Sequence, residues 1–330
     1  AKISLTLSHG WASAIKKFKS TTGPETAQLA NEAVYNTAID RGLDPSTVTL
    51  PFPDLSVVPT YDRNSDLFRT ASLSNYEVSA QGGNTNSTYY VGLGYTKQES
   101  IVKPSDFERY SGRLNYDNNL TSKLKIGTSI NISKVYRNVS SNDNNPKGVI
   151  NSAIFVRSYL PVFNEDGSYA RYGSFDNHLA LIDHLDNNAV TWRTIGNVFL
   201  EYNLLKDLKF RSSWSLDNTD LTENNYADTF VSAGIATKGS ATSYKAKNIV
   251  YTAEQLLTYN KVFKEKHALN VLLGNTINAV QEEYTSASGQ GFATNDLKDI
   301  SVASTKSGSA SKSESRLVSF FGKASYTFNH

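Results

Sequence analysis

The chain has 330 residues, a formal net charge of +2, and neither cysteine nor methionine. The interspersed charges exclude the basic stripe of a nucleic-acid-binding protein, and the absence of cysteine excludes a disulfide framework and a thiolate metal site. Tyr and Phe are abundant (19 and 15), yet the mean hydropathy of −0.41 is that of a water-soluble protein. Apolar residues spread over alternate positions give this combination in a transmembrane β-barrel or in a secreted β-sandwich.

The first predicted strand is Lys2–His9, where apolar residues alternate with serine and threonine from Ile3 to Leu7. A long excursion follows it. Within that excursion, proline in the first turn, many alanines and a closing Gly42 predict a helix over Pro24–Arg41. Because the chain opens on a strand without an initiator methionine, we expect it to be a piece of a longer polypeptide.

The stretch Phe68–Asp117 predicts three strands. In its second strand, alternate residues from Tyr89 to Tyr95 are apolar or aromatic, which is the two-residue period of a pleated strand with two different surroundings. The segment Gly82-Gly83-Asn84 predicts the turn between the first two strands, since glycine and asparagine accept the positive φ that a tight hairpin demands.

The clearest alternation runs from Leu124 to Ser133, where Leu, Ile and Thr oppose Lys, Gly, Ser and Asn. The pattern then disappears between Asn138 and Val190, which we interpret as a polar loop with a short helix at Val149–Tyr159. This loop is too long for a passive connection, so we expect it to carry function.

Alternation returns in the second half of the chain. It predicts strands near Asn197–Leu205, Leu208–Asp217, Ile249–Tyr259, His267–Ala279 and Val318–Phe328. Lys206-Asp207 predicts a two-residue hairpin, and every second connection along the chain is short. Outer-membrane barrels place all short turns on one side and all long loops on the other, whereas a Greek-key sandwich does not sort its loops in this way. We therefore predict an all-β fold: about ten antiparallel strands of a transmembrane barrel, with long extracellular loops that contain short helices.

The two faces of these strands have different predicted surroundings. A barrel directs one set of alternate residues to lipid, and a sandwich would instead bury the same set in a core. This set includes Val91, Leu93, Ile126, Ile130 and Val198. The opposite set faces the lumen in a barrel and includes Arg113, Lys125, Glu201, Lys209 and Arg211.

No catalytic constellation is evident. The histidines are scattered, and the gap between His178 and His184 is not a helical ligand spacing. We interpret Asp183-His184-x-Asp186 as part of a solvated loop. No cofactor is predicted; calcium is a weak candidate at loop carboxylates that lack a fixed motif spacing. Those carboxylates belong to Asp143, Asp166 and Asp176.

Aromatic residues in and near the long connections are the candidate ligand-binding residues. Aromatic faces stack on sugar rings and on apolar peptide side chains. The same residues would also serve in a membrane-interface belt or in packing between loops. The candidates are Trp11, Tyr159, Phe163, Tyr169, Tyr172 and Trp192.

An ordered series of short motifs resembles the SusC/RagA-like TonB-dependent outer-membrane transporters. The series covers nearly the whole chain. Its members are Phe68-Arg69-Thr70-Ala71, Asn75-Tyr76, Ser79-x-x-Gly82-Gly83-Asn84, Tyr89-Tyr90-Val91, Gly94-Tyr95, Gln98-Glu99-Ser100-Ile101-Val102, Phe107-x-Arg109-Tyr110-x-x-Arg113-Leu114-Asn115, Leu160-Pro161-Val162, Asp166-Gly167-Ser168-Tyr169, Gly196-Asn197, Leu200-Glu201-Tyr202, Leu257-x-Tyr259-Asn260, His267-x-Leu269 and Gly274.

The resemblance implies a barrel of about 22 strands around a plug domain. We see neither a plug nor a TonB box, so residues 1–330 are expected to be a partial barrel that lacks the plug and the remaining strands. The resemblance further implies uptake of an oligosaccharide or a peptide across the outer membrane of a Gram-negative, Bacteroidota-like cell. The implied partners are outer-membrane lipid, a SusD-like surface lipoprotein, and TonB-ExbB-ExbD acting through the absent plug. No enzymatic activity is implied.

The residues themselves leave one alternative open. A secreted carbohydrate-binding β-sandwich or an adhesin-like binding protein would have a similar composition and similar alternating strands.

Overall fold

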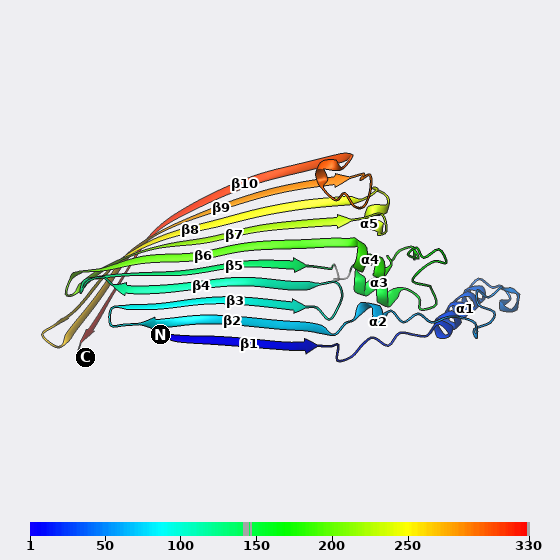
Figure 1. Ribbon diagram of the computed structural model, residues 1–330, viewed down its shortest axis with the longest axis horizontal. Coiled ribbons are helices and arrows are strands. Elements are labelled where there is room, and N and C mark those ends of the chain that lie inside the picture. Colours follow the sequence, from blue (N-terminus) through cyan, green and yellow to red (C-terminus); the bar gives the residue numbers. More distant parts are fainter. Residues whose placement is uncertain (141–144, 146, 329–330) are drawn as a thin grey trace.

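The computed structural model describes residues 1–140, 145 and 147–328, so Asp143 and His330 lie outside the described residues. It contains one antiparallel sheet of ten strands that follow one another in chain order (Figure 1). The strands are β1 (Lys2–Ala12), β2 (Ala71–Gly83), β3 (Ser87–Glu99), β4 (Asp106–Asn119), β5 (Leu124–Asn138), β6 (Leu185–Leu205), β7 (Leu208–Ala227), β8 (Ser240–Phe263), β9 (His267–Gln290) and β10 (Thr305–Phe328).

The helices all lie at the end of the sheet where the long connections gather (Figure 1). They are α1 (Gly23–Asp40), α2 (Asn64–Leu67), α3 (Val149–Phe155), α4 (His178–His184) and α5 (Ser232–Ile235), with 3₁₀ turns at Pro45–Thr47 and Ile300–Val302. The opposite end of the sheet carries the short turns, the start of β1 and the end of β10 (Figure 1). None of the helices in the described ranges is long and apolar enough to cross a membrane.

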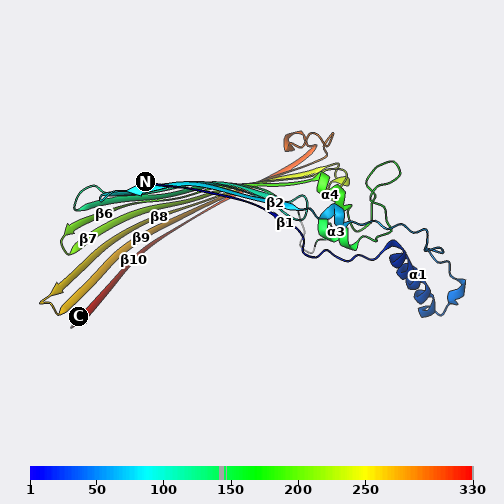
Figure 2. The same cartoon turned by 60° about the horizontal axis from the view of Figure 1, so that its bottom comes forward.

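The predicted sorting of the connections is confirmed. Short turns join β2 to β3, β4 to β5, β6 to β7 and β8 to β9, whereas the other connections lie at the helical end. The sheet is curved and twisted, and α1 projects beyond its end (Figure 2). We call the two ends the turn end and the loop end.

The sandwich prediction is wrong for the described residues, which contain a single sheet. Its expected core residues are not packed under a second layer: Leu93 is 60% exposed and Val198 is 51% exposed. The buried apolar residues instead gather at the loop end. One cluster contains Leu67, Val149, Ala153, Ala180, Leu181, Ala227 and Val231, and a smaller cluster contains Tyr226, Ala241, Phe292 and Ala303.

Several strands extend further toward the loop end than predicted. The strand predicted from Asn197 begins at Leu185, and the one predicted from Val318 begins at Thr305. In β10, the extra residues from Lys306 to Lys312 are serine, lysine, glycine and alanine, so neither face carries a large apolar side chain there. Backbone hydrogen bonds maintain the ladder regardless of side chain, so a strand can continue after its apolar alternation has ended.

The interpretation of the first hairpin is partly wrong. The turn lies at the predicted place, but neither Gly82 nor Gly83 has a positive φ. The Asn84 side chain shapes the turn by accepting hydrogen bonds from the amides of Asn86 and Ser87, both at 2.8 Å. Gly83 is needed for space, because a Cβ there would lie 2.4 Å from the Ser87 carbonyl oxygen.

The predicted helix over Pro24–Arg41 is confirmed as α1. Thr22 and Glu25 form a capping box, in which the Thr22 hydroxyl accepts from the Glu25 amide and the Glu25 carboxylate accepts from the Thr22 amide. The helix expected at Val149–Tyr159 is shorter and ends at Phe155, and α4 was not predicted.

Candidate functional site

One face of the sheet presents a continuous apolar band, and we call it the outward face. The strand register places Val78 beside Leu93, Val91 beside Leu114, and Leu114 beside Ile130. Thr128 lies beside Val198, which lies beside Trp214. The alternation read from the sequence therefore lines up across strands into one surface.

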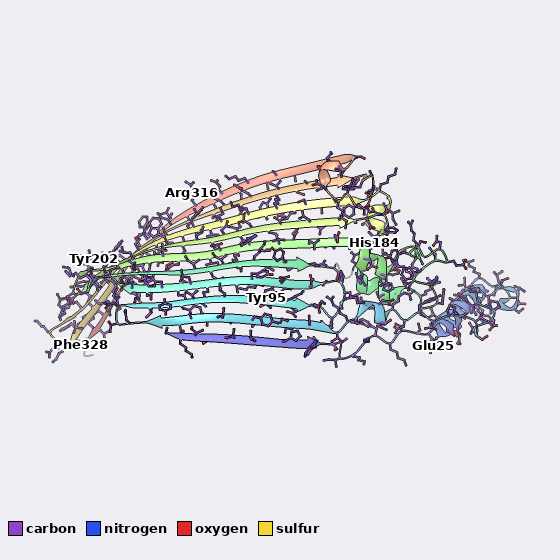
Figure 3. All side chains as sticks on the ribbon, viewed as in Figure 1. Glu25, Tyr95, His184, Tyr202, Arg316 and Phe328 are labelled. Carbon is purple, nitrogen blue, oxygen red and sulfur yellow. The ribbon has the colours of Figure 1, made fainter. Side chains whose placement is uncertain are left out.

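Aromatic rows bound this band at both ends. Toward the loop end, the ring centroids of Tyr76 and Tyr95 are 6.0 Å apart, and those of Tyr95 and Tyr110 are 5.0 Å apart. The register continues this row through Lys134 to Trp192. Toward the turn end, Tyr89 pairs with Tyr116, and Tyr202 pairs with Phe210. Figure 3 labels one member of each row, Tyr95 and Tyr202.

The separation between the two rows differs from strand to strand: Tyr89 and Tyr95 on β3 are roughly 20 Å apart, and the wider spacing on β6 matches a membrane. Trp192 and Tyr202 share β6 and are separated by roughly 33 Å along it, at about 3.3 Å per residue. With the strand tilt of about 40° that is typical of outer-membrane barrels, this corresponds to ~25 Å along the membrane normal, the usual height of their apolar band. Aromatic girdles flank that band in such barrels.

The opposite, inner face is polar and carries connected charges. The Glu201 carboxylate lies 3.0 Å from Lys209 and 3.6 Å from Arg211, and Lys125 lies 3.2 Å from Asp117. The Phe199 ring lies 4.1 Å from the Arg211 guanidinium. The predicted lumen-facing set shares this face, as the pairing of Lys125 with Glu201 and of Glu201 with Arg211 requires. These pairs are half exposed and are each worth only about 0–1 kcal/mol.

At the loop end, the connections interlock into a single body, which we call the loop cluster. The connection between β1 and β2 joins the connection between β5 and β6 through the fully buried His178, whose Nε2 lies 3.0 Å from the Asp66 carboxylate. The Arg63 guanidinium also donates to the Leu160 carbonyl at 2.7 Å. Asn177 caps α4 by accepting from the amides of Leu179 and Ala180.

Further contacts extend the loop cluster to the remaining long connections. His184 Nδ1 lies 2.6 Å from the Asp228 carboxylate, and the Ser232 amide and hydroxyl both donate to Asp176. Asn295 exchanges two hydrogen bonds with Thr229, and Lys298 forms an ion pair with Asp186. Polar contacts thus link the connections that follow β1, β5, β7 and β9.

A group of rings lies between two of these connections, and we call it the aromatic patch. It consists of Phe163, Tyr169, His184 and Phe230. The Tyr169 ring centroid lies 5.3 Å from Phe163, 5.2 Å from His184 and 5.9 Å from Phe230. Phe163 is 47% exposed and Phe230 is 44% exposed. The patch therefore offers apolar ring surface to a ligand arriving at the loop end.

The polar edge of the aromatic patch is set by Tyr169, whose hydroxyl donates to the Asp183 carboxylate at 3.0 Å. Burial and this carboxylate raise the pKa of Tyr169 to about 12, so the phenol stays neutral and keeps donating. The Asp183 carboxylate retains further lone pairs that can accept a hydrogen bond from a ligand hydroxyl or amide.

The structure brings together two of the six predicted ligand-binding residues, Phe163 and Tyr169. Tyr172 is directed elsewhere, since its hydroxyl donates to the Pro161 carbonyl at 2.6 Å and its ring lies 5.5 Å from the Arg63 guanidinium. Tyr159 packs on Phe52 with ring centroids 4.7 Å apart.

The remaining two candidates, Trp11 and Trp192, lie on the outward face and not in the loop cluster. Trp11 pairs with Ser72 near the loop end of β1, and its ring lies nearly perpendicular to that of His9, with ring centroids 4.7 Å apart. Trp192 belongs to the aromatic row at the loop end, whereas this row crosses β1 at Leu7 and Trp11 lies beyond it. A role of both residues in a membrane-interface belt stays a prediction.

The interpretation of Asp183-His184-x-Asp186 as a solvated loop is wrong. Asp183 and His184 end α4, and Asp186 is the second residue of β6. His184 pairs with Asp228, Asp183 accepts from Tyr169, and Asp186 pairs with Lys298. The apolar residues between Leu179 and Ile182, preceded by the capping Asn177, were the available signal for this helix.

Within the ranges that the structure describes, no group of three or more His, Asp or Glu side chains is placed to hold a metal ion. The carboxylate of Asp166 accepts from the Ser168 amide and hydroxyl, and that of Asp176 accepts from Ser232. Calcium binding in the loops stays a prediction.

Comparisons with known proteins show which proteins share this fold. No protein-family model matches the chain. It is 28% identical over 281 residues to TonB-dependent receptor P3 of Formosa agariphila, covering 81% of this chain and 28% of that protein. It is 26% identical over 186 residues to TonB-dependent receptor SusC of Bacteroides thetaiotaomicron, covering 48% of this chain and 18% of that protein. The chain thus spans less than a third of the length of these curated relatives.

Among solved structures, the RagAB peptide transporter superposes with a TM-score of 0.78 at 21% identity, covering 99% of this chain and 40% of that chain. The fold is therefore that of part of a TonB-dependent barrel, and the resemblance to SusC/RagA-like receptors is confirmed.

His178 makes the loop cluster sensitive to acid. Burial lowers the pKa of His178, and this effect outweighs the nearby Asp66 carboxylate, which acts to raise it. In the folded loop cluster the buried His178 ring stays neutral, whereas the exposed ring of the unfolded state takes up a proton below about pH 6.5. The free energy of unfolding of the loop cluster therefore falls as the pH falls through that value. We predict faster amide hydrogen exchange in α2 and α4 of the intact protein at pH 5.5 than at pH 7.5, after correction for intrinsic rates.

The substitution His178→Gln keeps a donor toward Asp66 but removes the titrating ring, so it should flatten this pH dependence. His267→Gln is the matched control, because His267 lies at the opposite end of the sheet. Exchange in α4 that is equally pH-dependent in His178→Gln would contradict the assignment to His178.

Proposed function

We propose that this chain forms part of the barrel wall of an outer-membrane importer, which takes up an oligosaccharide or a peptide with energy supplied through TonB. One observation carries the proposal: the sheet has an apolar outward face bounded by two aromatic rows, a charged inner face, and connections sorted by length between its ends. A membrane on one side and a filled lumen on the other account for all three features. The named relatives support it, because they are TonB-dependent receptors.

The two edges of the sheet fit a place within a larger barrel. In the described chain, β1 pairs only with β2, and β10 pairs only with β9. Unpaired backbone groups are costly in hydrocarbon, so these edges are where neighbouring strands of the full barrel would pair. The inner face, with its ladder around Glu201 and Phe199, would then pack against a plug that transmits the pull of TonB-ExbB-ExbD.

The loop end supplies the surface for a SusD-like lipoprotein partner. α1 projects beyond the loop cluster (Figure 2) and exposes the apolar side chains of Leu29, Tyr35 and Ile39. An exposed apolar group on a projecting helix is a feature of protein-binding surfaces. One solved structure of similar fold is described as a peptide importer, RagAB. We place this chain in the outer membrane of a Bacteroidota-like cell.

A growth experiment tests the proposed uptake. A strain with the complete gene deleted in frame should lose growth on one class of solute in a panel of glycans and peptides as sole carbon source, and the plasmid-borne gene should restore that growth. Growth on glucose is the control. Normal growth on every oligosaccharide and peptide tested, with the gene expressed in the parent strain, would count against import of these solutes.

The aromatic patch is the proposed ligand contact at the loop end. Replacing Phe163 and Phe230 together by alanine removes two exposed rings, and we predict at least a 10-fold weaker affinity of the purified receptor for its solute, equal to about 1.4 kcal/mol. Isothermal titration calorimetry with the solute found by the growth panel measures this. Phe155→Ala is the matched control, because Phe155 is exposed on α3 and stacks on Phe175. Unchanged affinity in the double variant would remove the patch from the binding site.

A further inference from the structure

The outward face is not uniformly flat. Near its loop end it contains a groove of about 720 Å³, and six of the residues that line it are Leu5, Val78, Leu93, Gly112, Ile132 and Trp192. The walls are overwhelmingly apolar, and the groove opens to the outside of the sheet. In the proposed function this surface meets the membrane, and the inference rests on that placement.

Gly112 makes the groove. The register places it directly between Leu93 and Ile132, in a row where its neighbours carry large side chains. A Cβ at Gly112 would meet only Leu93 Cδ2, at 3.6 Å, so the space above the backbone is free. One row toward the turn end, Leu114 fills the equivalent space between Val91 and Ile130. A side chain at Gly112 would therefore enter the groove, because its Cβ would meet no backbone atom within 4 Å.

The loop end of the groove is bordered by rings and by an ammonium group. The neighbouring rings of Tyr76, Tyr95 and Tyr110 form this border; Tyr76 and Tyr95 are stacked, and Tyr110 is tilted by 50° against Tyr95. Beside them, Lys134 lies 4.7 Å from the Trp192 ring and 4.6 Å from the Tyr136 ring. These rings hold the lysine at the border by cation–π contacts.

The charge at this border favours an anion. Lys134 forms no ion pair with any carboxylate of the described residues, and the same holds for Lys97, one row closer to the loops. Two carboxylates lie in these rows, and both are engaged: Glu108 pairs with Lys97 in the register and accepts a hydrogen bond from the Tyr110 hydroxyl, and Asp220 pairs with Trp192 and accepts from the Asn218 side-chain amide. Rings and not a carboxylate hold Lys134, so its ammonium group remains available to an anion.

We propose that this groove binds one anionic lipid of the outer leaflet, with an acyl chain between Leu93 and Ile132 and the phosphate at Lys134. The aromatic row marks the depth at which hydrocarbon gives way to head groups. An acyl chain needs an apolar trough on the hydrocarbon side of that depth, and a phosphate needs a cation at it. The groove and Lys134 supply both, in the order that a lipid requires.

Native mass spectrometry of the intact receptor in detergent tests the proposal, with phosphatidylglycerol and phosphatidylcholine added as probes. The wild-type receptor should retain one phosphatidylglycerol with at least 5-fold preference over phosphatidylcholine. Lys134→Gln should remove the preference but keep binding, and Gly112→Leu should abolish binding of both. Gly196→Leu is the matched control, because Gly196 lies on the same face outside the groove, with Ile130 Cγ1 at 4.0 Å.

Equal lipid retention in wild type, Lys134→Gln and Gly112→Leu would overturn the proposal. A loss of lipid in Gly196→Leu as large as that in Gly112→Leu would also overturn it, because the lipid would then coat the outward face without a specific site. A receptor dimer that Gly112→Leu dissociates would assign the groove to a second copy instead. A nitroxide at Ile126, also on the outward face, reports lipid contact in the same preparation. Lipid contact at the Ile126 nitroxide without a lipid retained in the mass spectrum would refute only lipid binding in the groove. Absence of lipid contact at this nitroxide would refute the proposed function.

Discussion

The structure depends on one constraint, the pairing of every backbone N–H and C=O group within a single layer of strands. A layer with no second sheet behind it can be stable only where each strand has neighbours and where the two faces have different solvents. The alternation from Leu124 to Ser133 meets the second condition, because it separates apolar from polar side chains at every step. The registers from β1 to β10 meet the first across the interior of the sheet.

The same constraint explains the division between the two ends. At the turn end, the described connections are all tight reversals, and Asn84 or the pair Lys206-Asp207 is enough to complete two of them. At the loop end, long connections need a core of their own, which Leu67, Val149 and Val231 provide. Buried polar contacts such as His178 with Asp66 then fix the connections to one another. The aromatic patch lies on a rigid base for this reason.

Much of this architecture could be predicted from the sequence, because a period of two residues identifies a strand and its faces together. The prediction failed where that period ends while the strand continues, as between Thr305 and Ser315 of β10, since neither face carries large apolar side chains there and the sequence no longer reveals the ladder. The loop cluster was also missed. Its contacts, such as His184 with Asp228, join residues far apart in the chain, and no local pattern marks them.

The central claim is that the outward face meets lipid and the inner face does not. Nitroxide labels placed singly at consecutive positions from Ile126 to Ile132 of the intact receptor in liposomes test it most directly, through collision with oxygen and with a water-soluble nickel complex. An outward face in lipid predicts high oxygen accessibility at even positions, such as Ile130, and low oxygen accessibility at odd positions, such as Asn131. Accessibility that does not alternate along β5, or water contact at Ile130, would contradict it.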